Sequence, residues 1–261
     1  MFVDSHVNLH GEKFEGDLDD VVARAVDAGV GTMLNICCKL SDFDATLAVA
    51  NCYPNMWASV GTHPHDAKDN PDITAAQLIE KASDPKVIGI GETGLDFHYN
   101  YSDEAAQFKN FRAHIDAARE TQLPLIIHSR NADDKMGDIL EAEMTKGAFP
   151  ALLHCYTSGE RLAQRGLDMG LYIAFSGIIT FKKADDVRAI VGLVPDNRIL
   201  IETDCPYLAP VPHRGHRCEP AFVVDVAHKL AELKGWNLKE TAKITTDNFF
   251  NLFTKAKRPT S

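Results

Sequence analysis

Long hydrophobic runs are absent from this sequence of 261 residues. No stretch approaches the roughly 18 consecutive apolar residues that a membrane-spanning helix needs. Residues 1–6 also lack the basic segment and apolar stretch of an export signal. We therefore expect a cytoplasmic protein that neither spans nor crosses a membrane.

Regularly spaced cysteines are absent too. The six cysteines form no C-x-x-C pair, and two of them, Cys37 and Cys38, are direct neighbours in the chain. This spacing does not suit a disulfide framework, so we expect reduced thiols, as in the cytosol.

An excess of positive charge is likewise missing, because 27 Lys and Arg residues stand against 37 Asp and Glu residues, for a net charge of -10. The chain as a whole offers no general field for a polyanion, so a nucleic acid would need a local site. The composition, 45% hydrophobic and 25% charged, excludes a largely disordered or collagen-like chain.

Two common catalytic strings do not occur. No G-x-S-x-G or P-loop sequence is present, so serine hydrolases and nucleotidases lack their usual signals. Residues 89–94 do match G-x-G-x-x-G after a strand, which would suggest a dinucleotide. That segment runs on into residues 95–100, which do not begin a helix, and we interpret the match as coincidental.

Short apolar runs that are typical of buried parallel strands recur along the chain. We expect eight strands, ending near His6, Cys37, His63, Glu92, His128, Cys155, Gly177 and Asp204. Helical patterns lie between them, as over residues 17–28, 103–121 and 158–169, and two more follow the last strand. The pattern predicts an α/β protein with one domain over residues 1–261, a (β/α)8 TIM barrel, with a doubly wound open sheet as the second choice.

Ionisable side chains end most of these strands, although a strand buried on both faces gives no structural reason for them. In a TIM barrel the carboxyl ends of the strands form the mouth where active sites are built. If the barrel closes, five side chains converge there: His6, Glu92, His128, His154 and Asp204. Imidazoles and carboxylates suit Zn²⁺ or Mn²⁺, and a shared carboxylate bridges two ions. The pattern predicts a metal centre, although any one such histidine alone is more often a core or loop residue.

Other polar residues receive structural interpretations. Cys155 follows His154 and should face the other side of its strand, where it packs. Asp96 either orients a ligand or caps a turn, and we favour the cap. The remaining histidines in loop or helix patterns receive no role: His10, His98, His114 and His228.

At these residues the sequence resembles the TatD family of metal-dependent deoxyribonucleases, within the amidohydrolase-like barrels. The matching strings cover nearly the whole chain, and together they are highly specific. They occupy residues 3–6, 61–65, 91–96, 127–130, 153–156, 175–177, 202–208 and 210–215.

The resemblance implies a barrel that binds divalent cations and hydrolyses phosphodiester bonds of DNA, commonly from the 3′ end. It implies that Glu92 bridges two cations, that His128 and His154 hold one, and that His6 and Asp204 hold the other. Asp204 would also take the proton from the attacking water, so Glu92 and Asp204 are the expected catalytic residues. The expected cofactors are two divalent cations, Mg²⁺, Mn²⁺ or Zn²⁺. The expected partner is single-stranded DNA or a DNA 3′ end, and no protein partner is inferred.

Residues on the mouth loops are candidates for the substrate. Two cations add four positive charges at the mouth and would attract a phosphate there. Four side chains would hold its oxygens, or form surface ion pairs instead: His63, His65, Arg130 and Arg214. Three aromatic residues would either stack a terminal base or pack under the loops: Phe97, Tyr156 and Tyr207.

The first strand departs from the family pattern. Relatives often carry H-x-H there, whereas this sequence has Asn8 in the second position. An amide offers a weak ligand or none, so we expect a weaker, oxygen-rich first site that suits Mg²⁺ or Mn²⁺ better than Zn²⁺. The alternative is that Asn8 only forms a hydrogen bond to a neighbouring loop.

Two other functions remain open from the sequence. An amidohydrolase acting on a small amide, lactone or phosphoester would use the same ligands at the mouth of the same barrel. A wide mouth lined by arginine and aromatic residues favours the nuclease, and a closed apolar pocket favours the small substrate. A non-catalytic scaffold with a vestigial metal site is the third possibility, and the intact ligands argue against it.

Overall fold

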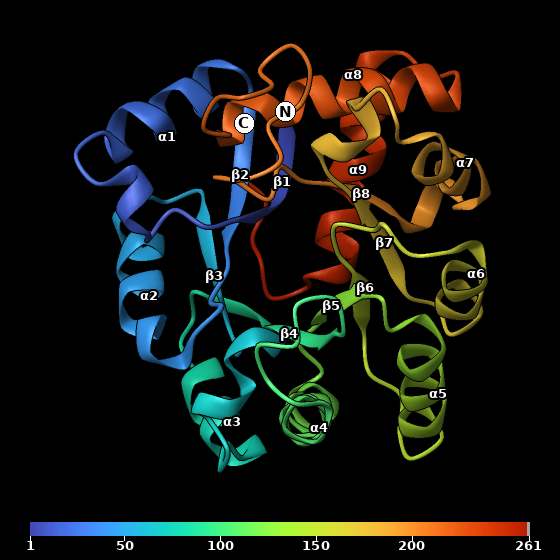
Figure 1. Cartoon of the computed structure of the whole chain (residues 1–261). Coiled ribbons are helices and arrows are strands. Elements are labelled where there is room, and N and C mark those ends of the chain that lie inside the picture. Colours follow the sequence, from blue (N-terminus) through green and yellow to red (C-terminus); the bar gives the residue numbers. More distant parts are fainter. Residues whose placement is uncertain (260–261) are drawn as a thin grey trace.

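Eight parallel strands form one sheet in the computed structural model, which describes residues 1–259 (Figure 1). Every strand pairs in parallel with the next one along the chain, so the order in the sheet is the order in the sequence. The strands are β1 Phe2–Val7, β2 Val30–Asn35, β3 Met56–Val60, β4 Val87–Asp96, β5 Leu125–Arg130, β6 Ala151–Leu153, β7 Tyr172–Phe175 and β8 Ile199–Ile201.

The sheet closes between its first strand and the residues that follow its last strand. Val7 forms a parallel bridge with Cys205. Two backbone hydrogen bonds support this bridge: the Asp204 N–H donates to the His6 carbonyl oxygen at 3.0 Å, and the Asn8 N–H donates to the Cys205 carbonyl oxygen at 2.9 Å. The predicted TIM barrel is therefore confirmed, and the open doubly wound sheet is excluded.

Helices follow the strands and lie around the ring that the strands form (Figure 1). The α-helices are α1 Leu18–Asp27, α2 Phe43–Cys52, α3 Ala75–Ala82, α4 Glu104–Thr121, α5 Asp133–Met144, α6 Glu160–Asp168, α7 Asp185–Leu193, α8 Val223–Lys234 and α9 Leu238–Leu252. Short 3-10 helices occupy Glu12–Phe14, Leu40–Asp42, Pro64–Asp69, Gly177–Thr180, Asp196–Arg198 and Pro220–Phe222. None of the helices within residues 1–259 is long and apolar enough to span a bilayer.

Helix α4 illustrates how the sequence sets these boundaries. The Asp103 carboxylate accepts a hydrogen bond from the Ala106 N–H and caps the first turn. At the other end Gln122 adopts a left-handed conformation with φ of 56°, and Pro124 prevents the helix from continuing. The expected helix over residues 103–121 is confirmed to within one residue.

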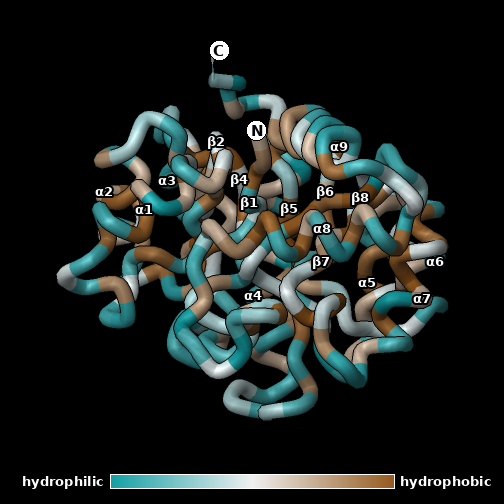
Figure 2. Tube along the Cα trace, turned by 90° about the horizontal axis from the view of Figure 1, so that it is seen from above, coloured by the Kyte–Doolittle hydropathy of each residue, from teal (hydrophilic) through white to brown (hydrophobic). Residues whose placement is uncertain are grey.

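Helix α9 closes the barrel at the end where the strands begin. Phe249 and Leu252 of this helix, and Phe253 directly after it, are buried with the apolar residues of the strands, such as Val3 and Ile126. Figure 2 shows hydrophobic segments along the strands and hydrophilic segments on the outer loops. Because α9 fills this end with apolar side chains, polar side chains gather at the opposite end.

The G-x-G-x-x-G match lies within strand β4, and no helix follows it directly. Gly94 has φ of 143°, a conformation that side chains other than glycine rarely adopt. A Cβ atom on Gly94 would also collide with the carbonyl oxygen of His128. This glycine therefore lets β4 approach β5 closely, and the dinucleotide interpretation is not needed to explain it.

Candidate metal centre

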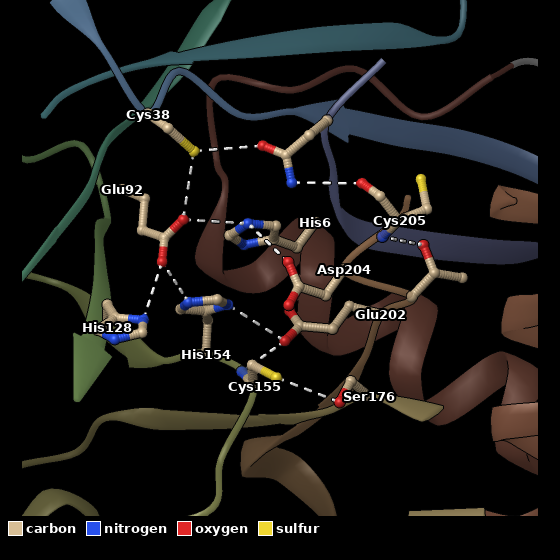
Figure 3. A network of polar contacts seen from close by, with 12 residues as sticks. His6, Cys38, Glu92, His128, His154, Cys155, Ser176, Glu202, Asp204 and Cys205 are labelled. Atoms are coloured by element: carbon tan, nitrogen blue, oxygen red, sulfur yellow. Dashed lines mark hydrogen bonds and ion pairs between the residues drawn. The ribbon is translucent and has the colours of Figure 1, made fainter. Parts of the chain in front are cut away.

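The five predicted ligands meet at the carboxyl ends of the strands. His6 comes from β1, Glu92 from β4 and His128 from β5. His154 directly follows β6, and Asp204 lies just after β8. Figure 3 shows their side chains pointing toward one another, with the carboxylate of Glu92 among the imidazoles. The barrel thus brings together residues that lie up to 198 positions apart in the chain (204 minus 6).

The two oxygens of Glu92 face different groups. Oε1 lies 2.7 Å from Nε2 of His154, 3.1 Å from Nδ1 of His128 and 3.4 Å from Nε2 of His63. Oε2 lies 3.4 Å from Nε2 of His6, whose same nitrogen is 3.5 Å from Oδ1 of Asp204. One carboxylate is therefore placed to join two groups of ligands.

These contacts decide the charge state of the buried carboxylate. Burial alone would raise the pKa of Glu92, but His154, His63 and His128 hold that pKa well below its usual range. Burial raises the pKa of Asp204 to about 6, although His6 and His154 oppose the change. The centre thus holds an ionised carboxylate beside one that is protonated more easily.

His6 gives a direct indication that the centre accepts a cation. Its side chain is fully buried, and within residues 1–259 neither ring nitrogen has a hydrogen-bond partner. A buried polar group without a partner costs about 1 to 3 kcal/mol. The Nε2 atom points at Glu92 and Asp204, so a cation between these residues would satisfy it. The donor set of imidazoles and carboxylates fits Zn²⁺ or Mn²⁺.

Two carboxylates that were not predicted as site residues orient the histidines from behind. Asp96 Oδ2 lies 3.1 Å from Nε2 of His128, and Glu202 Oε1 lies 3.4 Å from Nδ1 of His154. In each case the other ring nitrogen faces Glu92. Such partners fix the orientation and protonation of metal-binding histidines in proteins. The alternation of Glu202 with Asp204 along the last strand was the signal that could have found one of them.

Asp96 performs both roles that the sequence left open. Its Oδ1 accepts hydrogen bonds from the N–H groups of His98 and Tyr99 and so caps the turn after β4. Its Oδ2 contacts His65 Nε2 at 2.9 Å and His128 at 3.1 Å. His128 and His65 hold the pKa of Asp96 far below its usual range, against the effect of burial.

Local backbone strain occurs just after β6 and β8. Cys155 and Asp204 have φ angles of 42° and 59°, in the left-handed region that residues other than glycine rarely adopt. The N–H of Cys155 donates to Glu202 Oε1, and the Sγ of Cys155 lies 3.2 Å from Ser176 Oγ. Cys155 therefore packs beside the centre. Strained residues of this kind cluster at functional sites.

The four residues predicted to bind phosphate have different positions. His63 touches Glu92, and His65 is next to Asp96, so both belong to the cluster. The guanidinium of Arg130 lies 4.7 Å from the ring centre of Tyr99 at the rim. That of Arg214 packs 3.7 Å from the ring centre of Phe181 and donates to the Ala209 carbonyl oxygen. Within residues 1–259 Arg214 forms no hydrogen bond or ion pair with the cluster.

Two exposed aromatic residues beside the cluster were not singled out from the sequence. Tyr99 and Tyr101 are stacked with ring centres 5.3 Å apart, are 45% and 55% exposed, and both contact the ring of His65. Tyr156 is only 3% exposed and packs near Phe175, so packing is the correct alternative for it. Phe97 is half-buried, and Tyr207 is 56% exposed beneath Lys13.

Comparisons with known proteins agree with this geometry. A family model described as TatD related DNase matches residues 3–254. The uncharacterized metal-dependent hydrolase YcfH of Escherichia coli (strain K12) is 40% identical over 257 residues, covering 97% of this chain and 96% of the relative. The 3'-5' ssDNA/RNA exonuclease TatD of Salmonella typhimurium is 34% identical over 256 residues, covering 96% and 98%.

The fold of this chain is also similar to that of a solved structure. The crystal structure of YJJV, a TatD homolog from Escherichia coli K12, matches with a TM-score of 0.89 and 28% sequence identity. The match covers 97% of this chain and 98% of the other. The chain therefore belongs to the TatD-related DNase family of metal-dependent hydrolases.

Proposed function

We propose that this protein is a metal-dependent phosphodiesterase that removes nucleotides from the 3′ end of single-stranded DNA. One observation carries the proposal: a buried, ionised carboxylate, Glu92, with His128 and His154 against one oxygen and the unpartnered His6 against the other. A relative at 34% identity named as a 3'-5' ssDNA/RNA exonuclease supports the choice of substrate.

The ligand roles follow from these contacts. Glu92, His128 and His154 would hold one divalent cation, and His6, Asp204 and the other oxygen of Glu92 would hold a second. When bound, the cations would supply a hydroxide nucleophile near neutral pH and positive charge against the negative charge that develops on the phosphate oxygens. Glu92 and Asp204 are the proposed catalytic residues.

Side chains at the mouth would position the substrate and accept the proton of the attacking water. Asp204, half-buried at the mouth, would accept the proton of the attacking water. His63 and His65 face the same space from the segment after β3. Arg130 stands at the rim and would hold a phosphate oxygen farther along the strand. The phosphate role of Arg214 stays a prediction, because its guanidinium packs on Phe181.

A metal-restored cleavage assay tests the proposal. Protein stripped with EDTA is given a 5′-labelled single-stranded oligonucleotide with Mg²⁺, Mn²⁺ or Zn²⁺ added back. We expect a ladder that shortens from the 3′ end only after a cation is restored, and no ladder from the His128→Ala variant. His228→Ala, which changes an exposed histidine on α8, is the matched control and should cleave normally.

Two results would contradict the proposal. Cleavage that persists in EDTA would exclude the metal dependence. Absence of cleavage with all three cations, combined with metal-dependent turnover of a small lactone or amide, would instead favour the amidohydrolase alternative.

A further inference from the structure

Cys38 places its sulfur at the metal centre, a position the sequence did not lead us to expect. It follows β2 at the mouth of the barrel, and its Sγ lies 3.5 Å from Oε2 of Glu92 (Figure 3). Its neighbour Cys37 is fully buried and contacts the carbonyl oxygens of Lys39 and Gly61 instead. Of this adjacent pair, only Cys38 faces the bridging carboxylate.

Three distances in this group of atoms match edges of a tetrahedral cation site. Bonds of about 2.0 to 2.3 Å to nitrogen, oxygen and sulfur put neighbouring ligand atoms about 3.3 to 3.6 Å apart. Here Cys38 Sγ is 3.5 Å from Glu92 Oε2, which is 3.4 Å from His6 Nε2, and that nitrogen is 3.5 Å from Asp204 Oδ1. These four atoms therefore have the spacing of one coordination shell along each measured edge.

Asn8, just after β1, occupies the position where relatives often carry a second histidine. Its Nδ2 donates to the Cys205 carbonyl oxygen at 3.3 Å, and its Oδ1 lies 3.3 Å from the Cys38 Sγ. Both ends of the amide are therefore engaged within the protein. The hydrogen bond to the Cys205 carbonyl oxygen is the contact that the second interpretation of Asn8 expects, and the amide oxygen holds the Cys38 side chain beside Glu92.

His6 provides an independent indication of a ligand at the same place. Its Nε2 is fully buried, has no hydrogen-bond partner within residues 1–259, and lies near Asp204 and near Glu92, the carboxylate that Cys38 also contacts. A hydrogen bond from Cys38 to Glu92 alone would leave this nitrogen unsatisfied. A cation shared by the thiolate, the imidazole and the two carboxylates satisfies all of them.

We propose that Cys38, as a thiolate, is the fourth protein ligand of the cation held by His6, Glu92 and Asp204. The inference rests on the proposed metal-dependent function. The thiol proton passes to the solvent as the bond between sulfur and metal forms, and the positive ion stabilises the thiolate. Because thiolates prefer soft cations, this site selects Zn²⁺ over Mg²⁺. That preference is opposite to the one expected from Asn8 alone.

Cobalt binding followed by absorption tests the ligand directly. Co²⁺ is titrated into the metal-free full chain, the bound metal is counted by mass spectrometry, and the near-ultraviolet band of a thiolate–cobalt bond is recorded. The wild type should show the band, and Cys38→Ser should lose it together with at least about tenfold in affinity at one site. Cys37→Ser and the exposed Cys52→Ser are matched controls that should keep the band.

A second variant separates loss of the ligand from loss of the fold. The double change Asn8→His with Cys38→Ser supplies an imidazole in place of the sulfur. It should recover the lost affinity without the band, while circular dichroism confirms that every variant is folded. Cobalt bound by the wild type without a thiolate band would overturn this inference alone. A wild type that binds no cobalt would overturn the proposed metal centre and this inference with it.

Discussion

Glu202 lies behind the candidate metal centre and contacts it through His154. Its side chain is fully buried, and it accepts hydrogen bonds from the Ser5 hydroxyl and the Cys155 N–H while facing His154 Nδ1. His154 holds the pKa of Glu202 below its usual range against the effect of burial, so Glu202 is ionised behind the imidazole. A carboxylate here therefore fixes which nitrogen of His154 faces Glu92.

The Glu202→Gln variant tests this positioning role. The amide keeps an oxygen for the Cys155 N–H but removes the negative charge behind His154. Metal affinity at the site of His128 and His154 should fall about 10- to 100-fold. Competition with a chromogenic chelator measures this, and Asp134→Asn, at an exposed carboxylate on α5, should leave the affinity unchanged. An unaltered affinity in Glu202→Gln would show that Glu202 is only structural.

Tyr99 and Tyr101 form an exposed aromatic pair beside His65 and Arg130. Base stacking on an aromatic side chain contributes about 1 to 3 kcal/mol per base. Replacing both tyrosines with alanine should raise KM for single-stranded DNA about tenfold and leave kcat nearly unchanged, since neither ring faces Glu92. Steady-state kinetics measures both constants. Tyr172→Ala, at the start of β7 and so at the other end of the barrel, is the control. A fall in kcat with constant KM would refute the stacking role.

The sequence patterns predicted the strands themselves better than the residues at which the strands end. All eight strands were predicted, because continuous apolar runs identify buried strands. Five strands end two or three residues earlier than expected, and the sixth and eighth among them end at Leu153 and Ile201. Their polar ends leave the hydrogen-bonded ladder, as the left-handed φ of Cys155 and Asp204 shows, and no local pattern encodes that. Strand β4 is longer than predicted, since a register shift between Ile90 and Thr93 adds residues that alternation does not reveal.

The convergence of the candidate ligands could be predicted from the sequence, whereas the residues that support them could not. Polar residues at strand ends identified Glu92 and the three histidines, because the barrel topology alone brings them together. Cys38 lies in a loop after β2, outside any strand pattern. Its contact with Glu92 depends on the path of that loop, and the sequence alone does not determine it.

Helix α4 is joined to the loop after β3 through a buried histidine, His114. The Thr62 N–H donates to its Nε2 at 3.0 Å, and its Nδ1 faces the Asn110 carbonyl oxygen at 2.9 Å. The ring must be neutral to accept from Thr62. Burial accordingly lowers the pKa of His114 to about 4, although the bond to Asn110 opposes this.

This histidine should make the free energy of unfolding depend on pH. Below an unfolded pKa of about 6.5 the unfolded chain binds a proton that the folded chain does not, so stability falls as the pH drops toward 4. Between pH 7 and pH 5 the wild type should lose about 2 kcal/mol more than His114→Gln. Urea unfolding at both pH values measures the difference, in which other titrating groups cancel. His228→Gln should behave like the wild type, and equal losses in wild type and His114→Gln would contradict the argument.

The two ends of the barrel differ in the side chains that fill them. The aromatic side chains of α9 fill the end where the strands begin, so the core there is apolar. The mouth collects buried polar and strained residues instead. The sequence predicted α9 as a helix but not its place under the barrel, because a helical pattern shows which face is apolar and not which surface covers it.

If this acidic protein acts on DNA, the attraction must come from a local part of its surface. The net charge of -10 would repel DNA at long range, and attraction would be confined to the mouth, where two cations would add four positive charges beside Arg130. A nuclease with 6 to 10 phosphate contacts loses about 10³- to 10⁵-fold in affinity between 50 and 200 mM salt. Here KM for single-stranded DNA should rise less than about tenfold over that range. The Arg130→Ala variant should reduce the slope of log KM against log salt by about 0.7, the value for one contact with a single strand. A steep wild-type slope, or an unchanged slope in the variant, would place the DNA on a basic surface away from this mouth.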